Sequence, residues 1–329
     1  MIGLELTPEH PTGHLAELGE RAEAEGFDAV FASSHYNNRD PFVALDRIAR
    51  RTDDVAVGPG VANPYETHPV TLAARVASLD EASGGRAVFG LGAGDRSTLS
   101  NLGYDRERPL ARVLESMRVA RRLFDGERVD HEGTFLARDA GLNFADAVGS
   151  VPVYVGAQGP HMTRMAATHA DGVLYNGSHP RDLAWAADRV EEGLADRPDD
   201  RGAFDFAAYA SVSIAEDDDA ARVAARPPVA FIAAGAADPL LERHELDADV
   251  AAEIGEHVEA GRFEAAFEAV TPAMVDAFSI AGTPATVADR VAAVLEHADS
   301  LVVGAPLGPD LASAIGLAGS VLRESVPRR

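Results

Sequence analysis

Eight short apolar runs alternate with longer amphipathic segments along the chain, and this alternation restricts the possible folds more than any other feature. The runs expected as strands cover residues 2–6, 29–32, 55–58, 87–91, 153–155, 172–175, 206–214 and 301–304. The segments expected as helices cover residues 13–25, 41–50, 71–82, 108–124, 161–170, 181–194 and 310–323. Strands that alternate with helices pair in parallel, so the pattern predicts an α/β fold. A closed (β/α)8 TIM barrel accounts best for eight such units, and a doubly wound open sheet is the alternative.

A long interval between the last two expected strands breaks this alternation. Helix-like segments within it cover residues 217–225, 229–234, 249–260 and 272–278. They predict a helical insertion at about residues 216–285. Because no linker-like stretch interrupts the chain, we expect a single α/β barrel domain over residues 1–329.

The composition excludes several functions. The chain carries 29 Lys and Arg against 53 Asp and Glu, a net charge of −24, and all of its basic residues are arginine. The acids are spread along the sequence, which favours a surface adapted to high salt over an acidic interaction tail. Such a surface repels phosphate groups, so neither nucleic acid nor an anionic membrane is an expected partner. Without lysine or cysteine there is no Schiff-base catalysis, P-loop lysine, disulfide or thiolate metal ligand.

The sequence also predicts where the protein works. No apolar run approaches the roughly 20 residues that a membrane-spanning helix needs. The first residues lack the basic region of a signal peptide. We therefore expect a cytoplasmic protein.

Polar or glycine-rich segments follow most of the expected strands, where an α/β barrel carries its active site. They are Ser33-Ser34-His35-Tyr36-Asn37-Asn38 and residues 58–65, 90–96, 156–160 and 176–180. Taken singly, these segments are also ordinary loops. The first fits turn chemistry as well as ligand recognition. The segment 90–96 carries Asp95 where a dinucleotide-binding fingerprint needs its third glycine, so it is a weak signal for that fold.

Glu5 stands inside the first expected strand, which a barrel covers on both sides. A buried carboxylate is costly unless it is used in chemistry or paired, and both interpretations stay open for Glu5. The loops together suit a flat polar heterocycle with a phosphate-bearing tail. Because clusters with metal-ligand spacing and a Ser-His-Asp arrangement are both missing from the sequence, we expect no metal and no hydrolytic triad.

These segments resemble the coenzyme F420-dependent methylenetetrahydromethanopterin reductases, a branch of the bacterial-luciferase-like superfamily. The resemblance covers essentially the whole chain. Its motifs are Gly3-Leu4-Glu5, His35-Tyr36-Asn37-Asn38, Gly58-Pro59-Gly60-Val61, Gly94-Asp95, Gly156-Ala157-Gln158-Gly159-Pro160, Ala230-Phe231-Ile232-Ala233-Ala234-Gly235, Glu242-Arg243-His244, Ala277-Phe278-Ser279, Gly282-Thr283-Pro284, Pro306 and Gly308-Pro309-Asp310. Because the composition is acidic and free of lysine, we expect the chain to be a haloarchaeal-type member of this family.

The resemblance implies a luciferase-like barrel with an insertion before its last strand, assembled as a homodimer or homotetramer. It implies hydride transfer from reduced coenzyme F420 to the methylene carbon of a methylenetetrahydropterin, giving the methyl-pterin. Opening the methylene bridge needs a proton on the departing nitrogen, and the family position that supplies a general acid matches Glu5. Asp95 matches a position near the pterin, and we class both as catalytic residues.

The resemblance also implies a non-proline cis peptide behind the deazaflavin ring, and the matching pair is Gly60-Val61. The predicted coenzyme-binding residues are Ser33, Ser34, His35, Gly60, Val61, Asn63, Gly94, Gly156, Gln158, Gly159 and Asn176. Ser33-Ser34 occupy positions where methanogen enzymes carry Thr-Asp, so FMN or another electron donor is an alternative.

Other functions stay open at this stage. A salt-adapted lifestyle favours methylenetetrahydrofolate over methylenetetrahydromethanopterin as substrate. The superfamily also contains F420- or FMN-dependent alcohol dehydrogenases and monooxygenases. A non-catalytic flavin-binding homologue is the alternative from a different class.

Overall fold

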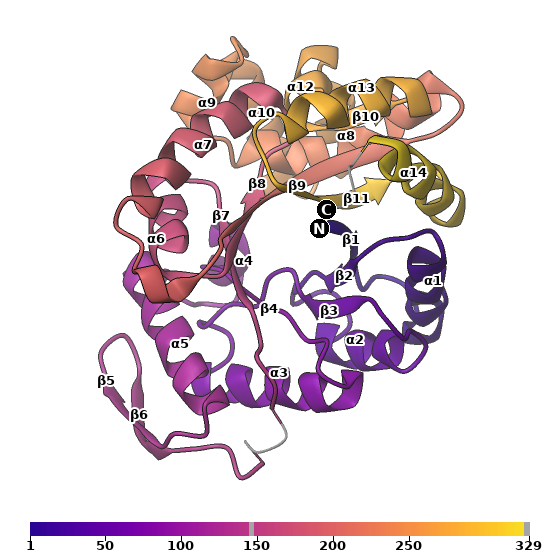
Figure 1. The fold of residues 1–329 in the computed structure, drawn as a ribbon. Helices are drawn as coiled ribbons and strands as arrows, with labels where there is room; N and C mark the ends of the chain where they lie inside the picture. The colour runs from indigo at the N-terminus through magenta and orange to yellow at the C-terminus, as the bar shows by residue number, and fades with distance from the viewer. Residues whose placement is uncertain (145–147, 326–329) are drawn as a thin grey trace. The chain divides into compact units, whose positions relative to one another are not determined.

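The computed structural model describes residues 1–144 and 148–325, which form two compact units (Figure 1). The N-terminal unit comprises Gly3–Tyr175 and Asp188–Ala207 together with Met1. The C-terminal unit comprises Asn176–Ala187 and Ala208–Arg329 together with Ile2. No helix in the described part of the chain combines the length and apolar character needed to cross a bilayer.

Six parallel strands form the N-terminal unit. They are β1 (Ile2–Leu6), β2 (Ala29–Ala32), β3 (Ala56–Pro59), β4 (Phe89–Leu91), β7 (Val153–Ala157) and β8 (Gly172–Asn176). Each pairs with its neighbour along the chain, and the bridges Val57↔Ala87 and Ala62↔Leu91 join the β3 and β4 segments. The strand order therefore follows the chain order, as repeated strand–helix units require. Parallel pairing also brings the carboxyl ends of these strands to one edge.

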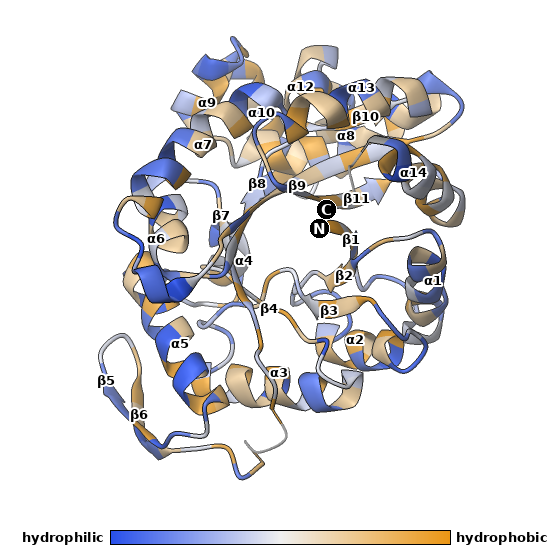
Figure 2. Cartoon of the chain, viewed as in Figure 1, coloured by the Kyte–Doolittle hydropathy of each residue, from blue (hydrophilic) through white to orange (hydrophobic). Residues whose placement is uncertain are grey.

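Helices connect these strands. They are α1 (Thr12–Ala24), α2 (Pro41–Ala49), α3 (Pro69–Ser83), α4 (Arg96–Asn101), α5 (Pro109–Phe124) and α6 (Pro160–His169). α2 shows how local sequence sets a helix start. Asp40 accepts hydrogen bonds from the N–H groups of Phe42 and Val43, and Pro41 is the first residue of the helix. Its buried face carries Leu45 and Ile48. Figure 2 accordingly shows both hydrophobic and hydrophilic residues on α1, α2, α3, α5 and α6.

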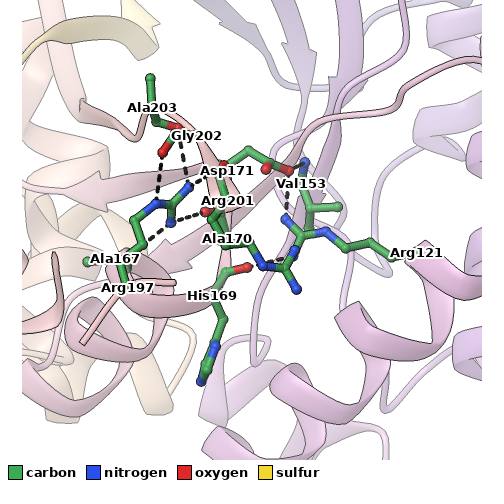
Figure 3. A network of polar contacts seen from close by, with 10 residues as sticks. All are labelled: Arg121, Val153, Ala167, His169, Ala170, Asp171, Arg197, Arg201, Gly202 and Ala203. Atoms are coloured by element: carbon green, nitrogen blue, oxygen red, sulfur yellow. Dashed lines mark hydrogen bonds and ion pairs between the residues drawn. The ribbon is translucent and has the colours of Figure 1, made fainter. Parts of the chain in front are cut away.

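A polar network fixes the starts of β7 and β8, at the edge away from the candidate site (Figure 3). The Arg121 guanidinium contacts the Asp171 carboxylate at 2.7 Å, and the same carboxylate accepts from the N–H of Val153 at 2.7 Å. Arg197 donates to the carbonyls of Ala167 and Ala170, which lie at the end of α6. Guanidinium groups thus satisfy backbone carbonyls that the helix end leaves unpaired.

The hairpin of β5 (Val129–Glu132) and β6 (Leu136–Ala140) was not predicted from the sequence. It lies beside α5 in Figure 1. The Glu115 carboxylate of α5 holds it, accepting from the N–H of Thr134 at 2.7 Å and lying 3.1 Å from His131 Nε2. The polar sequence of the strands hides this element, since it lacks the apolar alternation of a half-buried strand.

The C-terminal unit contains β9 (Asp205–Ile214), β10 (Ile280–Gly282) and β11 (Ser300–Leu307), and β9 pairs with both others. Its helices are α7 (Pro180–Leu194, in part), α8 (Asp218–Ala234), α9 (Asp238–Arg243), α10 (Ala248–Glu259), α11 (Phe263–Ala269), α12 (Pro272–Phe278), α13 (Pro284–Leu295) and α14 (Leu311–Ser325). The predicted helical insertion is present between β9 and β10, where Val229, Ile254 and Phe278 lie in a shared apolar core.

Parts of the insertion differ from the prediction. α8 is one helix through Pro227 and Pro228, whereas two helices were expected on either side of this pair. Proline removes hydrogen bonds and disfavours helix before it, but here Ala225 and Val229 are both fully buried on the same face. Packing therefore overrides the local signal. The helices α9, α11 and α13 and the short strand β10 were not predicted.

Candidate active site

Glu5 lies in β1 opposite Phe31 of β2 and is only 4% exposed. Its carboxylate accepts a hydrogen bond from the Thr7 hydroxyl at 3.0 Å. Because Thr7 directly follows β1, the carboxyl group is directed toward the carboxyl ends of the strands. The buried acid is therefore partnered, as burial demands, and it lies at the edge where the candidate loops begin.

The predicted cis peptide at Gly60-Val61 is present. The Val61 side chain packs against two glycines that come from neighbouring strand ends. A Cβ atom on Gly92 would lie 2.5 Å from Val61 Cγ2, and one on Gly156 would lie 3.1 Å from the same atom. Glycine at these positions therefore leaves the space that the Val61 side chain fills.

Gly58 and Gly90 lie where the backbones of neighbouring strands run close together. A Cβ on Gly58 would lie 2.1 Å from the Val88 carbonyl oxygen, and one on Gly90 would lie 1.9 Å from that of Pro59. These two glycines allow adjacent strands to approach each other.

We expect Gly92→Ala to lower the free energy of unfolding by about 1–3 kcal/mol, because the new methyl group overpacks against Val61. Adding Val61→Ala should restore much of this loss, since it removes the clashing Cγ2. Denaturant unfolding of both single variants and the double variant measures this coupling. Additive losses would contradict the proposed contact.

Asn63 is 6% exposed, and its amide is engaged within its own loop. Its Oδ1 accepts from the N–H groups of Tyr65 and Glu66, and its Nδ2 donates to the Glu66 carboxylate at 2.9 Å. Next to it Gly94 has a φ of 72°, and a Cβ there would lie 3.2 Å from Asn63 Cβ. Asn63 thus shapes the loop after the cis peptide, and direct contact of its amide with a coenzyme stays a prediction.

Asp95 caps the start of α4. Its Oδ2 accepts from the Thr98 N–H at 2.7 Å and from the Ser97 hydroxyl. Partial burial alone would raise the pKa of Asp95, but hydrogen bonds from Ser97 and Thr98 outweigh it and lower the pKa below its usual value. Asp95 is therefore ionised near neutral pH and can act only as a hydrogen-bond acceptor.

Two cavities adjoin the loop after β2. One, of about 240 Å³, is bordered by Ser34, His35 and Asn63, while Ser33 lies half-buried just before it. The other, of about 440 Å³, lies against Glu9 in the loop after β1. Both are also bordered by Asn38 and Arg39. The structure thus brings several predicted coenzyme-binding residues to the wall of one hollow.

The segment after β7 also suits a ligand. Gly159 precedes α6, and no side chain caps this helix end. The first N–H groups of α6 are therefore free of side-chain caps, and such N–H groups bind anions at the ends of other helices. Gln158 is exposed, and within the described residues its amide has no hydrogen-bond partner. Asn176 is exposed at the start of the C-terminal unit, so its part in coenzyme binding stays a prediction.

Known proteins match the chain over nearly its full length. The model of the luciferase-like monooxygenase family matches residues 2–299. The chain belongs to this family. It is 40% identical to the 5,10-methylenetetrahydromethanopterin reductase of Archaeoglobus fulgidus, with 99% of each chain covered. It is also 40% identical to the protein of that name from Methanolobus tindarius, over 97% of this chain and 98% of the other.

A solved structure is similar as well. It is the coenzyme F420-dependent tetrahydromethanopterin reductase from Methanopyrus kandleri, with a TM-score of 0.89 and 36% identity over 99% of this chain and 97% of that one. The predicted family resemblance and the predicted (β/α)8 barrel are confirmed. The predicted enzyme class, an oxidoreductase, is confirmed by the same matches.

The C-terminal unit of this luciferase-like chain contains a buried ionic cluster around Asp182 at the start of α7. The Asp182 carboxylate lies 2.7 Å from Arg243 Nη1 and 2.8 Å from His244 Nε2, both from the Glu242-Arg243-His244 motif. The Arg243 guanidinium lies 4.4 Å from the Trp185 ring centroid, and the His179 ring lies 4.8 Å from that of His244. The cluster fixes the end of α9 to the start of α7. Sequence reasoning missed it, because its members are about 60 residues apart along the chain.

His179 makes this cluster sensitive to pH. Burial and the nearby charge of Arg290 lower the pKa of His179 to about 4. Unfolded histidine titrates near pH 6.5, so only the unfolded state takes up this proton between about pH 6.5 and 4. We therefore expect the free energy of unfolding to fall as pH is lowered through this range. Denaturant unfolding should show a shallower fall for His179→Gln and an unchanged one for the exposed control His10→Gln. Equal slopes in the wild type and His179→Gln would contradict this account.

Proposed function

We propose that the protein transfers a hydride from reduced coenzyme F420 to the methylene carbon of a methylenetetrahydropterin and releases the methyl-pterin. One observation carries this proposal. Two proteins that match the chain over 97–99% of its length are each named for a reductase of this substrate class. The similar structure from Methanopyrus kandleri is named as coenzyme F420-dependent.

The residues of the N-terminal unit fit a flat coenzyme with an anionic tail. The cis peptide at Gly60-Val61 is the one that the family resemblance predicts behind the coenzyme ring. Cavities of about 240 and 440 Å³ adjoin the loop after β2, and each accommodates part of a ligand whose whole pocket measures about 300–1,000 Å³. The uncapped end of α6 after Gly159 offers N–H groups to an anion such as a phosphate.

The protein's own groups supply acid–base chemistry and alignment. Glu5 protonates the departing pterin nitrogen when the methylene bridge opens. The ionised Asp95 accepts hydrogen bonds from the amino-pyrimidine edge of the pterin. When bound, reduced coenzyme F420 supplies the hydride, and the surrounding loops exclude water.

Finer features belong to the same proposal. The carboxylate-rich, lysine-free sequence supports the proposal that the protein works in a cytoplasm of high salt. In such a cytoplasm we favour methylenetetrahydrofolate over methylenetetrahydromethanopterin as the substrate. We further propose a single barrel domain over residues 1–329 that assembles as a homodimer or homotetramer.

An anaerobic assay in multimolar potassium chloride tests the reaction. Reduced coenzyme F420, reduced FMN and NADH are each offered with each of the two methylene-pterins, and methyl-pterin is quantified by chromatography. We expect methyl-pterin with reduced coenzyme F420. Turnover confined to FMN or NADH would show that one of these is the electron donor in place of coenzyme F420, and the proposed reaction on the pterin would still hold. A tightly retained flavin without turnover on any pair would instead support the non-catalytic homologue.

A further inference from the structure

Thr98 contacts two predicted site residues through two different groups. His35 Nε2 lies 3.2 Å from the Thr98 hydroxyl oxygen. The backbone N–H of Thr98 donates to the Asp95 carboxylate at 2.7 Å. Thr98 is 6% exposed, so water has little access to this hydroxyl group. Neither the reaction proposed above nor the sequence motifs assign Thr98 a role.

The partners of the His35 ring fix where its proton lies. The backbone N–H of Asn37 donates to His35 Nδ1 at 3.3 Å, so Nδ1 carries no hydrogen. In a neutral ring the hydrogen is then on Nε2, which donates to Thr98 Oγ1. The Asp95 carboxylate accepts the backbone N–H of the same threonine. Thr98 therefore holds the imidazole through its hydroxyl group and the carboxylate through its backbone.

Thr98 also joins two loops with different predicted tasks. His35 belongs to the loop after β2, which is expected to bind the coenzyme. Asp95 ends the loop after β4 and is expected to bind the pterin. Within the described residues one further bond connects the same segments, from Asn101 Nδ2 to the Tyr36 hydroxyl at 3.4 Å, and it lies at the surface. Thr98 provides the buried connection.

We propose that Thr98 is a positioning residue that couples coenzyme binding at the His35 loop to pterin binding at Asp95. It does so by accepting the Nε2–H of His35 with its hydroxyl oxygen and by donating its backbone N–H to the Asp95 carboxylate. Each ligand then finds the other's loop already ordered, so each increases the affinity for the other by the same factor. This inference rests on the proposed function for the identity of the two ligands.

Binding measurements on a complex that cannot react test the coupling. Oxidised coenzyme F420 and a methylene-pterin are both oxidised partners, so they form a ternary complex without hydride transfer. We expect the pterin to tighten coenzyme binding by about tenfold in the wild type, within the range of ordinary allosteric coupling. Thr98→Val should reduce this to less than about twofold, while Thr98→Ser, which keeps the hydroxyl, should retain it. Tyr36→Phe removes only the exposed bond and is the matched control.

A second measurement needs no ligand. In ¹⁵N NMR of histidine-labelled protein, with the His35 signal assigned by its loss in His35→Gln, we expect the Nε2–H form in the wild type and Thr98→Ser. In Thr98→Val the Nε2–H group loses its acceptor while the Asn37 N–H still binds Nδ1, so we expect the Nε2 signal of His35 to shift. A wild-type coupling factor near one, undiminished coupling in Thr98→Val, or an unchanged His35 spectrum in that variant would overturn the proposal. A failure of the wild type to bind either ligand would count against the proposed function, whereas the NMR result would still decide the role of Thr98.

Discussion

Replacement of Glu5 by glutamine lowers kcat by about 10²- to 10⁴-fold if this carboxyl group is the general acid of the reaction. Glutamine preserves the size of the side chain and can still accept the hydrogen bond from Thr7. It cannot deliver a proton to the pterin nitrogen. Because the coenzyme and the pterin make their other contacts elsewhere, their dissociation constants should change little.

Steady-state assays with reduced coenzyme F420, together with binding of the oxidised coenzyme, separate these effects. The control is Glu20→Gln, whose side chain is 59% exposed on α1 and forms only a long ion pair with Arg51. Its kcat should equal that of the wild type, because exposed pairs of this kind contribute little. If Glu5→Gln kept full turnover, Glu5 would be a structural acid of β1, paired with Thr7 and uninvolved in proton transfer.

The elements that could be predicted are those whose signals are local. β2 begins and ends at the predicted residues, and β1 does so as well, since both are short apolar runs next to turn residues. The insertion was placed correctly, but α8 runs on through Pro227 and Pro228 because its buried face packs against other helices. Such packing depends on residues far away in the sequence, which no local pattern contains.

In the candidate site, too, some features could be predicted from local sequence and others could not. Parallel strands bring their carboxyl ends to one edge, so the loops after β1, β2, β3, β4 and β7 could be predicted as neighbours. The structural role of each individual residue in these loops could not be predicted. Gly90 makes room for a neighbouring strand, and Thr98 meets His35 across 63 positions of sequence. The only local signal at Thr98 is an ordinary helix start, with Asp95 three residues earlier.

Asp182→Asn should lower the free energy of unfolding by about 3–5 kcal/mol, the loss typical of a broken buried ion pair. The Asp182 side chain is 5% exposed, and its partners Arg243 and His244 are 17% and 4% exposed. Asparagine keeps the shape but leaves the Arg243 charge buried without its counter-charge. The control on the same helix is Asp188→Asn, whose side chain is 71% exposed and which should change stability by no more than about 1 kcal/mol.

The pH dependence of this loss follows from the same contacts. Burial alone would raise the pKa of Asp182. The hydrogen bonds from His244 and Arg243 have the larger effect and lower this pKa below its usual value. A carboxyl group with a lowered folded-state pKa stabilises the fold above its unfolded value near pH 3.9, and this contribution is lost as pH falls through the folded value. Denaturant unfolding should therefore show the full difference between wild type and Asp182→Asn at pH 7 and a smaller one near pH 3. Because salt screens buried pairs weakly, the pH 7 difference should also persist in multimolar potassium chloride. A difference that vanished in that salt would mean that Asp182 acts as a surface charge, and the cluster would then not be what fixes the end of α9 to the start of α7.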